Sequence, residues 1–178
     1  MTPKQHPVRG IDHIGITVPD VEQATTFLQN AFGAGICYDA LNKPQPPQKG
    51  EQTEQQLGLK RGARIIHIRL LRIHEGPGIE LFQLENTPQN FAIQLADYGL
   101  QHFAVYVDDM NAATARFQQA GGTLLSPPHA LSGIEAGAGN QFVYGRSPWG
   151  TIIELISYPD GIRYPQESEA YRWTPPER

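Results

Sequence analysis

The chain has 178 residues, which suits one domain or two small similar modules with a shared core. Its 14 basic and 18 acidic residues leave a formal net charge of -4, so the composition favours neither nucleic acid nor an anionic membrane as a partner. The single cysteine, Cys37, excludes an intrachain disulfide framework and a thiolate zinc cluster. The N-terminus has no apolar core of signal-peptide length, and no stretch approaches the ~18 consecutive apolar residues of a membrane helix, so we expect a cytoplasmic protein.

The first half of the chain predicts a strand, a helix and two further strands. Residues 11–18 alternate and are rich in β-branched side chains, which favours a strand. Asp20, followed three residues later by a glutamine, has the form of a capping box and predicts a helix that ends at Gly33. Residues 65–73 and 79–85 predict two strands joined by a Gly/Pro turn.

Between these elements, residues 34–64 are polar and Pro-rich, and we interpret them as a solvated surface loop with a short helix near residues 51–59. Arg69 and Arg72 in the following strand are cations that an anionic substrate would require. We nevertheless assign both arginines, together with His67, to exposed strand positions.

The second half predicts a similar series of elements. Residues 86–99 indicate a polar connection with a short helical piece, and residues 100–110 a strand that runs into a helix capped by Asp109. Residues 129–140 are Gly/Ala-rich and are predicted to be mobile, and the tail at 159–178 is polar and Pro-rich. Three further strands are expected at residues 123–125, 141–145 and 151–158.

An internal repeat relates the two halves. An offset of 89 residues superimposes the first predicted strand and helix on the second copy and places His13 opposite His102. An offset of 74 residues superimposes two later strands and places Glu80 opposite Glu154, each inside an otherwise apolar strand.

Matched histidines and glutamates are best explained by a metal. A single strand histidine is usually a core or surface residue, and burial of an unpaired carboxylate is very unfavourable. If the two halves are related by a pseudo-twofold axis, the four side chains converge in one cleft, where a divalent cation would compensate the carboxylates and accept the imidazole nitrogens. The predicted metal ligands are His13, Glu80, His102 and Glu154.

At these positions the sequence resembles the vicinal oxygen chelate superfamily. This superfamily, also described as the glyoxalase, bleomycin resistance protein and dioxygenase family, includes glyoxalase I, methylmalonyl-CoA epimerase, extradiol dioxygenases and fosfomycin resistance proteins. The stretches that carry the resemblance are DHIGITVPD (residues 12–20), GIEL (78–81), HFAVYVDD (102–109) and SPWGTIIEL (147–155).

The resemblance implies an α+β fold of two paired βαβββ modules that form an open cleft around one metal ion. It implies one domain over residues 1–178, with modules at 10–85 and 99–158 followed by the tail. The ligand positions of the family fall on the four residues named above. Relatives of this kind are often homodimers, so we expect a homodimer that acts on a small-molecule substrate.

Strand alternation adds candidate substrate-binding residues. Tyr106 shares a face with His102, and Phe82 shares a face with Glu80, so both aromatic side chains are expected to line the cleft. Tyr144 is a weaker candidate for the same role.

Four protein ligands favour an octahedral ion such as Ni, Co, Mn, Fe or Mg, or an expanded Zn site, because a catalytic zinc usually has three protein ligands. Two open positions would then accept the vicinal oxygens of a substrate. The expected activity is that of a glyoxalase-like lyase or isomerase, in which the metal polarises a carbonyl and stabilises an enediolate after proton removal. Either Glu154 or Glu80 would be the catalytic base.

Two alternatives use the same site differently. A mononuclear iron dioxygenase of the extradiol type would use a facial triad such as His13, His102 and Glu154, but Glu80 would then occupy a position that oxygen chemistry requires open. A non-enzymatic binding or resistance protein would hold its ligand in the cleft without a complete ligand set.

Overall fold

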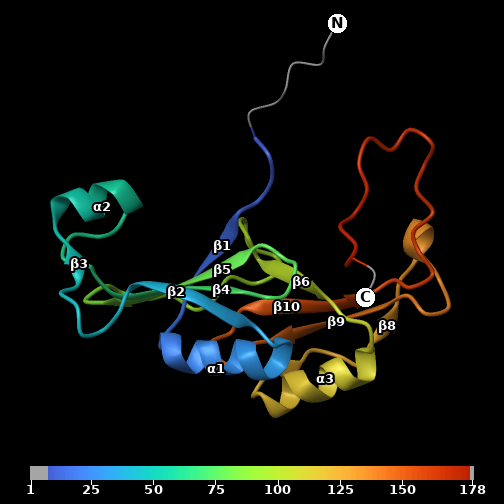
Figure 1. Ribbon diagram of the computed structural model, residues 1–178, viewed down its shortest axis with the longest axis horizontal. Coiled ribbons are helices and arrows are strands. Elements are labelled where there is room, and N and C mark those ends of the chain that lie inside the picture. The colour runs from blue at the N-terminus through green and yellow to red at the C-terminus, as the bar shows by residue number, and fades with distance from the viewer. Residues whose placement is uncertain (1–7, 177–178) are drawn as a thin grey trace, which may run out of the picture. The chain divides into compact units, whose positions relative to one another are not determined.

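The computed structural model describes residues 8–176 and contains two five-stranded sheets (Figure 1). Its backbone forms two compact units, one made of the residues up to Thr25 with Ala34–Thr87, and one made of Thr26–Gly33 with the residues from Pro88 onward. Each sheet belongs to one unit, and each unit is described below in its own right.

The first sheet has the strand order β1-β5-β4-β2, with β3 also paired to β4. β1 and β5 are parallel, whereas β5, β4 and β2 are antiparallel neighbours. Its strands are β1 (His13–Thr17), β2 (Gly35–Leu41), β3 (Gln48–Lys49), β4 (Arg64–Arg72) and β5 (Gly78–Glu85), and the helices that come between them in the chain are α1 (Val21–Phe32) and α2 (Glu51–Leu57).

Helix α1 begins and ends as the sequence predicts. The backbone N–H of Gln23 donates to Asp20 Oδ1 at 2.9 Å, which satisfies one of the donors that a helix N-terminus leaves unpaired. Gly33 ends the helix with a positive φ of 68°, a conformation that costs glycine little. The backbone N–H of Val21 donates to Gln83 Oε1 on β5 at 3.1 Å and so fixes the start of α1 on the first sheet.

The interpretation of residues 34–64 as a solvated loop was wrong over its first part. β2 pairs antiparallel with β4 there, although six of its seven residues are exposed. Because β2 is an edge strand with exposed side chains, it carries no alternating apolar pattern that sequence inspection could detect. The short helix expected near residues 51–59 is present as α2.

Arg69 and His67 are buried, which corrects their assignment to exposed strand positions, whereas Arg72 is exposed. The Arg69 guanidinium donates to both carboxylate oxygens of Asp39, at 2.6 and 3.1 Å, and to both of Glu22, at 2.7 and 3.0 Å. These paired hydrogen bonds compensate the desolvation of the guanidinium and lower the pKa of Asp39 below its usual value.

The second sheet repeats the arrangement of the first. Its order is β6-β10-β9-β7, with β8 paired to β9, and its one parallel pair is β6 with β10. The elements are β6 (His102–Tyr106), α3 (Met110–Gln119), β7 (Thr123–Leu124), β8 (His129–Ala130), the short 3-10 helix η1 (Gly133–Glu135), β9 (Gln141–Arg146) and β10 (Ile152–Ser157).

The helix expected within residues 86–99 is absent. That segment contains a single turn, in which Asp97 Oδ2 accepts from the backbone N–H of Gln94 at 2.7 Å and the Asp97 N–H donates back to the Gln94 carbonyl at 3.0 Å. An aspartate that bonds to nearby backbone in this way favours an isolated turn over a continuing helix. The predicted cap of α3 is confirmed, because Asp109 accepts from the backbone N–H of Ala112.

Phe117 of α3 forms the centre of the core in the second unit. Its ring is fully buried and packs against Phe27 and Phe32, with ring centroids 5.5 and 6.0 Å apart. A Cβ atom added at Gly122 or Gly145 would lie 2.3 or 2.5 Å from the Phe117 ring, so both positions require glycine for close packing.

With the insertions β3–α2 and β8–η1 set aside, each half of the chain follows the order strand, helix, strand, strand, strand. This arrangement confirms the predicted α+β fold of two βαβββ modules, and both sheets are open. None of the helices in residues 8–176 has the length and apolar character required to span a bilayer.

Substitution of Arg69 by methionine should lower the free energy of unfolding by about 2 to 3 kcal/mol, because the carboxylates of Asp39 and Glu22 lose their partner. Arg72→Met on the same strand is the matched control and should change it by less than about 0.5 kcal/mol. The folded-state pKa of Asp39 lies below its usual 3.8, so this stabilisation is present above that pH and is lost as pH falls through the folded value. Urea unfolding at pH 7 and pH 3 should therefore show a smaller difference between wild type and Arg69→Met at pH 3.

Substitution of Gly145 by alanine should destabilise the protein by about 1 to 3 kcal/mol, since the new methyl group would overlap the buried Phe117 ring. For a chain of this length we expect a melting temperature lower by roughly 3 to 10 °C, measured by circular dichroism. Gly35→Ala is the control, because its Cβ would meet no atom within 4 Å. Equal melting temperatures for the two variants would contradict this account of the core.

Candidate functional site

In the first unit, the parallel pairing of β1 with β5 brings a histidine and a glutamate to one face of the sheet. Gly15 lies opposite Glu80 in the register, and His13 lies opposite Gly78. His13 and Gly15 are two residues apart and share a face, so His13 and Glu80 are diagonal neighbours. A Cβ at Gly78 would lie 3.1 Å from the His13 Cβ, whereas one at Gly15 would meet only Phe82, at 3.8 Å.

The two ring nitrogens of His13 have different partners. Nδ1 lies 2.8 Å from Asp12 Oδ2, and because a carboxylate accepts only, Nδ1 is the donor. Nε2 therefore faces Glu80 Oε2, at 3.3 Å. The hydrogen bond to Asp12 and, to a smaller extent, the charge of Glu80 raise the pKa of His13 above its usual value.

The second unit repeats this geometry on β6 and β10. Ala104 lies opposite Glu154, which places His102 and Glu154 on one face, and His102 Nε2 is 3.5 Å from Glu154 Oε2. His102 Nδ1 forms a short hydrogen bond with the side-chain oxygen of Gln101, the residue that precedes it, as Asp12 precedes His13. The correspondence of the halves thus extends to the group that orients each imidazole.

Glu154 is the more deeply placed of the two glutamates. Its side chain is 10% exposed, compared with 25% for Glu80. Burial raises the pKa of Glu154, and the nearby His102 opposes this effect. Tyr144 lies directly opposite Glu154 on β9, and burial, followed by the charge of Glu154, raises the pKa of the tyrosine.

The donor sets fit a divalent metal. Each pair offers an imidazole Nε2 and a carboxylate oxygen 3.3 to 3.5 Å apart, close to the roughly 3 Å that separates adjacent ligands of an octahedral ion. Each imidazole is also oriented through Nδ1 by an acceptor, as is usual for metal-binding histidines. Each unit supplies two of the four predicted ligands. Within residues 8–176 no three His, Cys, Asp or Glu side chains lie close enough together to hold one ion. The convergence of the four therefore stays a prediction.

The candidate substrate-binding residues divide between the units. Phe82 shares the face of Glu80 and packs against a small core cluster at Leu41 and Ile68. In the second unit, Tyr144 contacts the His102 ring edge-to-face, with centroids 5.3 Å apart.

Tyr106 lies opposite Ile156 of β10, on the sheet face that carries His102 and Glu154. Its ring meets that of Tyr158 edge-to-face, with centroids 4.8 Å apart. The sequence therefore identified the faces of Tyr106 and Phe82, and the role of all three aromatic residues in binding a substrate stays a prediction.

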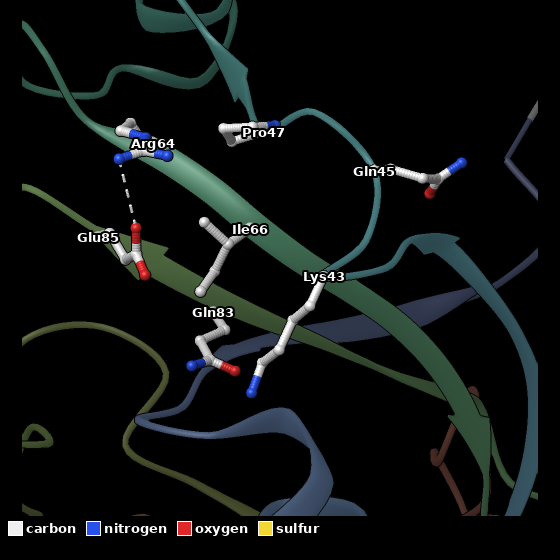
Figure 2. A pocket seen from close by; sticks show the side chains of 7 residues that line it. All are labelled: Lys43, Gln45, Pro47, Arg64, Ile66, Gln83 and Glu85. Carbon is white, nitrogen blue, oxygen red and sulfur yellow. Dashed lines mark ion pairs between the residues drawn. The ribbon is translucent and has the colours of Figure 1, made fainter.

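A pocket of about 330 Å³ lies elsewhere in the first unit, close to the pairing of β3 with β4 (Figure 2). Arg64 and Glu85 form an ion pair across it at 3.6 Å, and Lys43 pairs with Asp20 at 3.0 Å. The charged side chains of this pocket are thus already paired within the protein. Neither His13 nor Glu80 lines it. Its lining residues are Lys43, Gln45, Pro47, Arg64, Ile66, Gln83 and Glu85.

Residues 129–140 contain β8 and η1, and Asn140 joins this segment to the tail. The Asn140 side chain is fully buried and makes three hydrogen bonds. Its Nδ2 donates to the carbonyls of Glu135 and Gly161, both at 2.8 Å, and its Oδ1 accepts from the backbone N–H of Asp160 at 3.0 Å. A single polar side chain therefore holds a loop and the beginning of the tail together.

Sequence reasoning missed two groups of residues, the acceptors that orient the histidines and the residues that join the loop to the tail. Asp12 and Gln101 occupy equivalent positions of the repeat, and the shared acceptor chemistry was a signal available in the alignment of the two halves. No comparable signal marked Asn140, Glu135 or Arg172, because these residues meet only after the chain has folded.

Two βαβββ modules, each with a histidine and a glutamate on one face of its sheet, define a recognisable class of protein. The family model described as Glyoxalase/Bleomycin resistance protein/Dioxygenase superfamily matches residues 12–144. The chain belongs to this superfamily.

Individual relatives agree with this assignment. A 2-epi-5-epi-valiolone epimerase from Actinomyces sp. is 29% identical over 167 residues, which cover 93% of this chain and 88% of the relative. A glyoxalase family protein from Bacillus cereus has a similar structure, with a TM-score of 0.67 at 18% identity, covering 86% of this chain and 97% of the other.

A fosfomycin resistance protein from Listeria monocytogenes was solved as a mutant in complex with Mn(II) and 1S,2S-dihydroxypropylphosphonic acid. It shares the fold with a TM-score of 0.52 at 18% identity, covering 84% of this chain and 90% of that chain. The family and the epimerase relative together support an enzyme of this superfamily.

Substitution of Asn140 by alanine should destabilise the second unit by about 1 to 3 kcal/mol, because the three hydrogen bonds of this fully buried side chain are lost. The tail should also become a faster substrate for trypsin at Arg163 and Arg172. Asn111→Ala, at an exposed position of α3, is the matched control. Equal cleavage rates in the two variants would show that Asn140 does not hold the tail.

Proposed function

We propose that this protein is a metal-dependent isomerase or lyase, of the epimerase kind, that removes a proton next to a carbonyl of a small substrate with vicinal oxygens. The observation that carries the proposal is the repeated pair, in which an oriented imidazole Nε2 faces a glutamate oxygen at 3.3 Å in one unit and 3.5 Å in the other. The epimerase relative favours isomerisation over elimination. The homodimer that the resemblance implies stays a prediction.

The proposed metal ligands are His13, Glu80, His102 and Glu154. A bound divalent ion would supply Lewis-acid polarisation of the substrate oxygens. The superfamily member solved with Mn(II) supports a divalent ion of this type. Asp12 and Gln101 would hold the imidazoles in the tautomer that leaves Nε2 able to bind.

Proton transfer is assigned to the two glutamates. Glu154 is the proposed base, because its largely buried carboxylate is poorly solvated and gains most from accepting a proton. Inversion at carbon also requires a proton donor, and Glu80, whose side chain is more accessible, is the proposed group. Tyr144 and Tyr106 would line the substrate side of the same sheet face as Glu154 and exclude water.

The proposal is tested on protein stripped with a chelator and reloaded with Mn(II) or Co(II). We expect one ion per chain by elemental analysis, a lower melting temperature without metal, and metal-dependent exchange of the carbon-bound proton of 2-hydroxycyclohexanone with D₂O, followed by NMR. His13→Ala and His102→Ala should each weaken metal binding by at least about 100-fold. His74→Asn, at an exposed residue with a positive φ of 45° that asparagine tolerates, is the control.

The stoichiometry separates a shared ligand set from two independent sites. One ion per chain whose binding is lost in both histidine variants supports the shared set. Two ions per chain, or loss in only one of these variants, would contradict it. A protein that binds no metal and catalyses no exchange would refute the proposed function.

A further inference from the structure

The C-terminal tail, residues 159–176, contains no helix or strand, yet hydrogen bonds tie it to defined points of the second unit. In Figure 1 the tail, drawn in red, rises beyond the end of β10 and returns toward the second sheet. The hydroxyl of Tyr158 forms a short hydrogen bond with the carbonyl of Trp173. The backbone N–H of the adjacent Arg172 donates to the hydroxyl of Tyr164 at 2.9 Å. These contacts fix the backbone on both sides of one arginine.

The side chain of Arg172 is directed to the region beside the catalytic face. Its guanidinium carbon lies 5.0 Å from the centre of the Tyr158 ring, and its Nη1 donates to Glu135 Oε1 at 2.6 Å. Tyr158 in turn packs edge-to-face on Tyr106, which stands on the same sheet face as His102. A continuous series of contacts therefore connects the ion pair to the proposed substrate side of the sheet.

The ion pair combines donors and an acceptor in an accessible position. The side chains of Arg172 and Glu135 are 35% and 36% exposed, so a ligand can reach them. A guanidinium carries five N–H donors, of which one N–H group serves the contact with Glu135, and a carboxylate accepts at both oxygens. Adjacent donors and acceptors of this kind match two neighbouring hydroxyl groups, since each hydroxyl both donates and accepts.

We propose that the Arg172–Glu135 pair is a substrate-recognition element that binds neighbouring hydroxyl groups of a neutral, polyhydroxylated substrate. The inference rests on the proposed function, because it names the substrate class of that same site. An anionic substrate group is disfavoured, since the carboxylate of Glu135 already neutralises the charge of Arg172. The Asn140 hydrogen bond to the Glu135 carbonyl makes Asn140 a positioning residue for the pair.

The test is a calorimetric titration of the full-length, metal-loaded protein with myo-inositol and, as its anionic counterpart, myo-inositol 1-phosphate. We expect wild type to bind inositol at least tenfold more tightly than the phosphate. Arg172→Gln and Glu135→Gln should each raise the Kd for inositol about tenfold or more, because charged hydrogen-bonding groups contribute strongly to recognition of hydroxyls. Arg163→Gln, at an exposed arginine of the same tail, should leave the Kd unchanged.

Glu135→Gln keeps the guanidinium above Tyr158, and it decides the outcome if Arg172→Gln lowers the melting temperature. Inositol affinity that is equal in Glu135→Gln and wild type, a preference for the phosphate, or no inositol binding by wild type would overturn the inference. The titration requires no turnover and can be repeated without metal. Loss of metal binding and of proton exchange would therefore refute the proposed function separately from polyol recognition.

Discussion

One parallel strand pair in each sheet positions the chemistry of this protein. β1 beside β5, and β6 beside β10, bring together residues that are far apart in sequence, and in both pairs the register sets a glutamate opposite a residue with little or no side chain, Gly15 or Ala104. A histidine two residues earlier on the same strand then reaches the glutamate diagonally. A register shift of one residue would turn the histidine to the opposite face, so the apolar alternation that fixes the register also fixes the pair.

The same alternation makes the opposite face of the strands apolar, and the core of the first unit also contains a buried guanidinium. Arg69 is held there by Asp39 and Glu22 through four hydrogen bonds. Glu154 is a different case, because among the described residues its buried carboxylate faces only an imidazole nitrogen, His102 Nε2, at 3.5 Å. A structural charge is thus fully compensated within the fold, whereas the charge assigned to catalysis is compensated only in part, which leaves it able to bind a cation or accept a proton.

The fold and the paired residues were predictable because they rest on local patterns and on a repeat. Asp20 and Asp109 cap their helices as the sequence predicts, and His13 and His102 face Glu80 and Glu154. The failures have physical causes. The exposed edge strand β2 has no apolar pattern, and burial of Arg69 depends on carboxylates 30 and 47 residues away in the chain.

The sequence by itself determined the two modules, the strands that carry the histidines and glutamates, and the faces of the aromatic residues, since side-chain alternation and capping act over a few residues. Only the tertiary structure decided which glutamate is more deeply buried, that Asn140 joins the loop to the tail, and that Arg172 meets Glu135 beside Tyr158. Those contacts join segments that have no common pattern. They form between parts of the chain that meet only once it has folded, and such long-range complementarity has no periodic trace in the order of the residues.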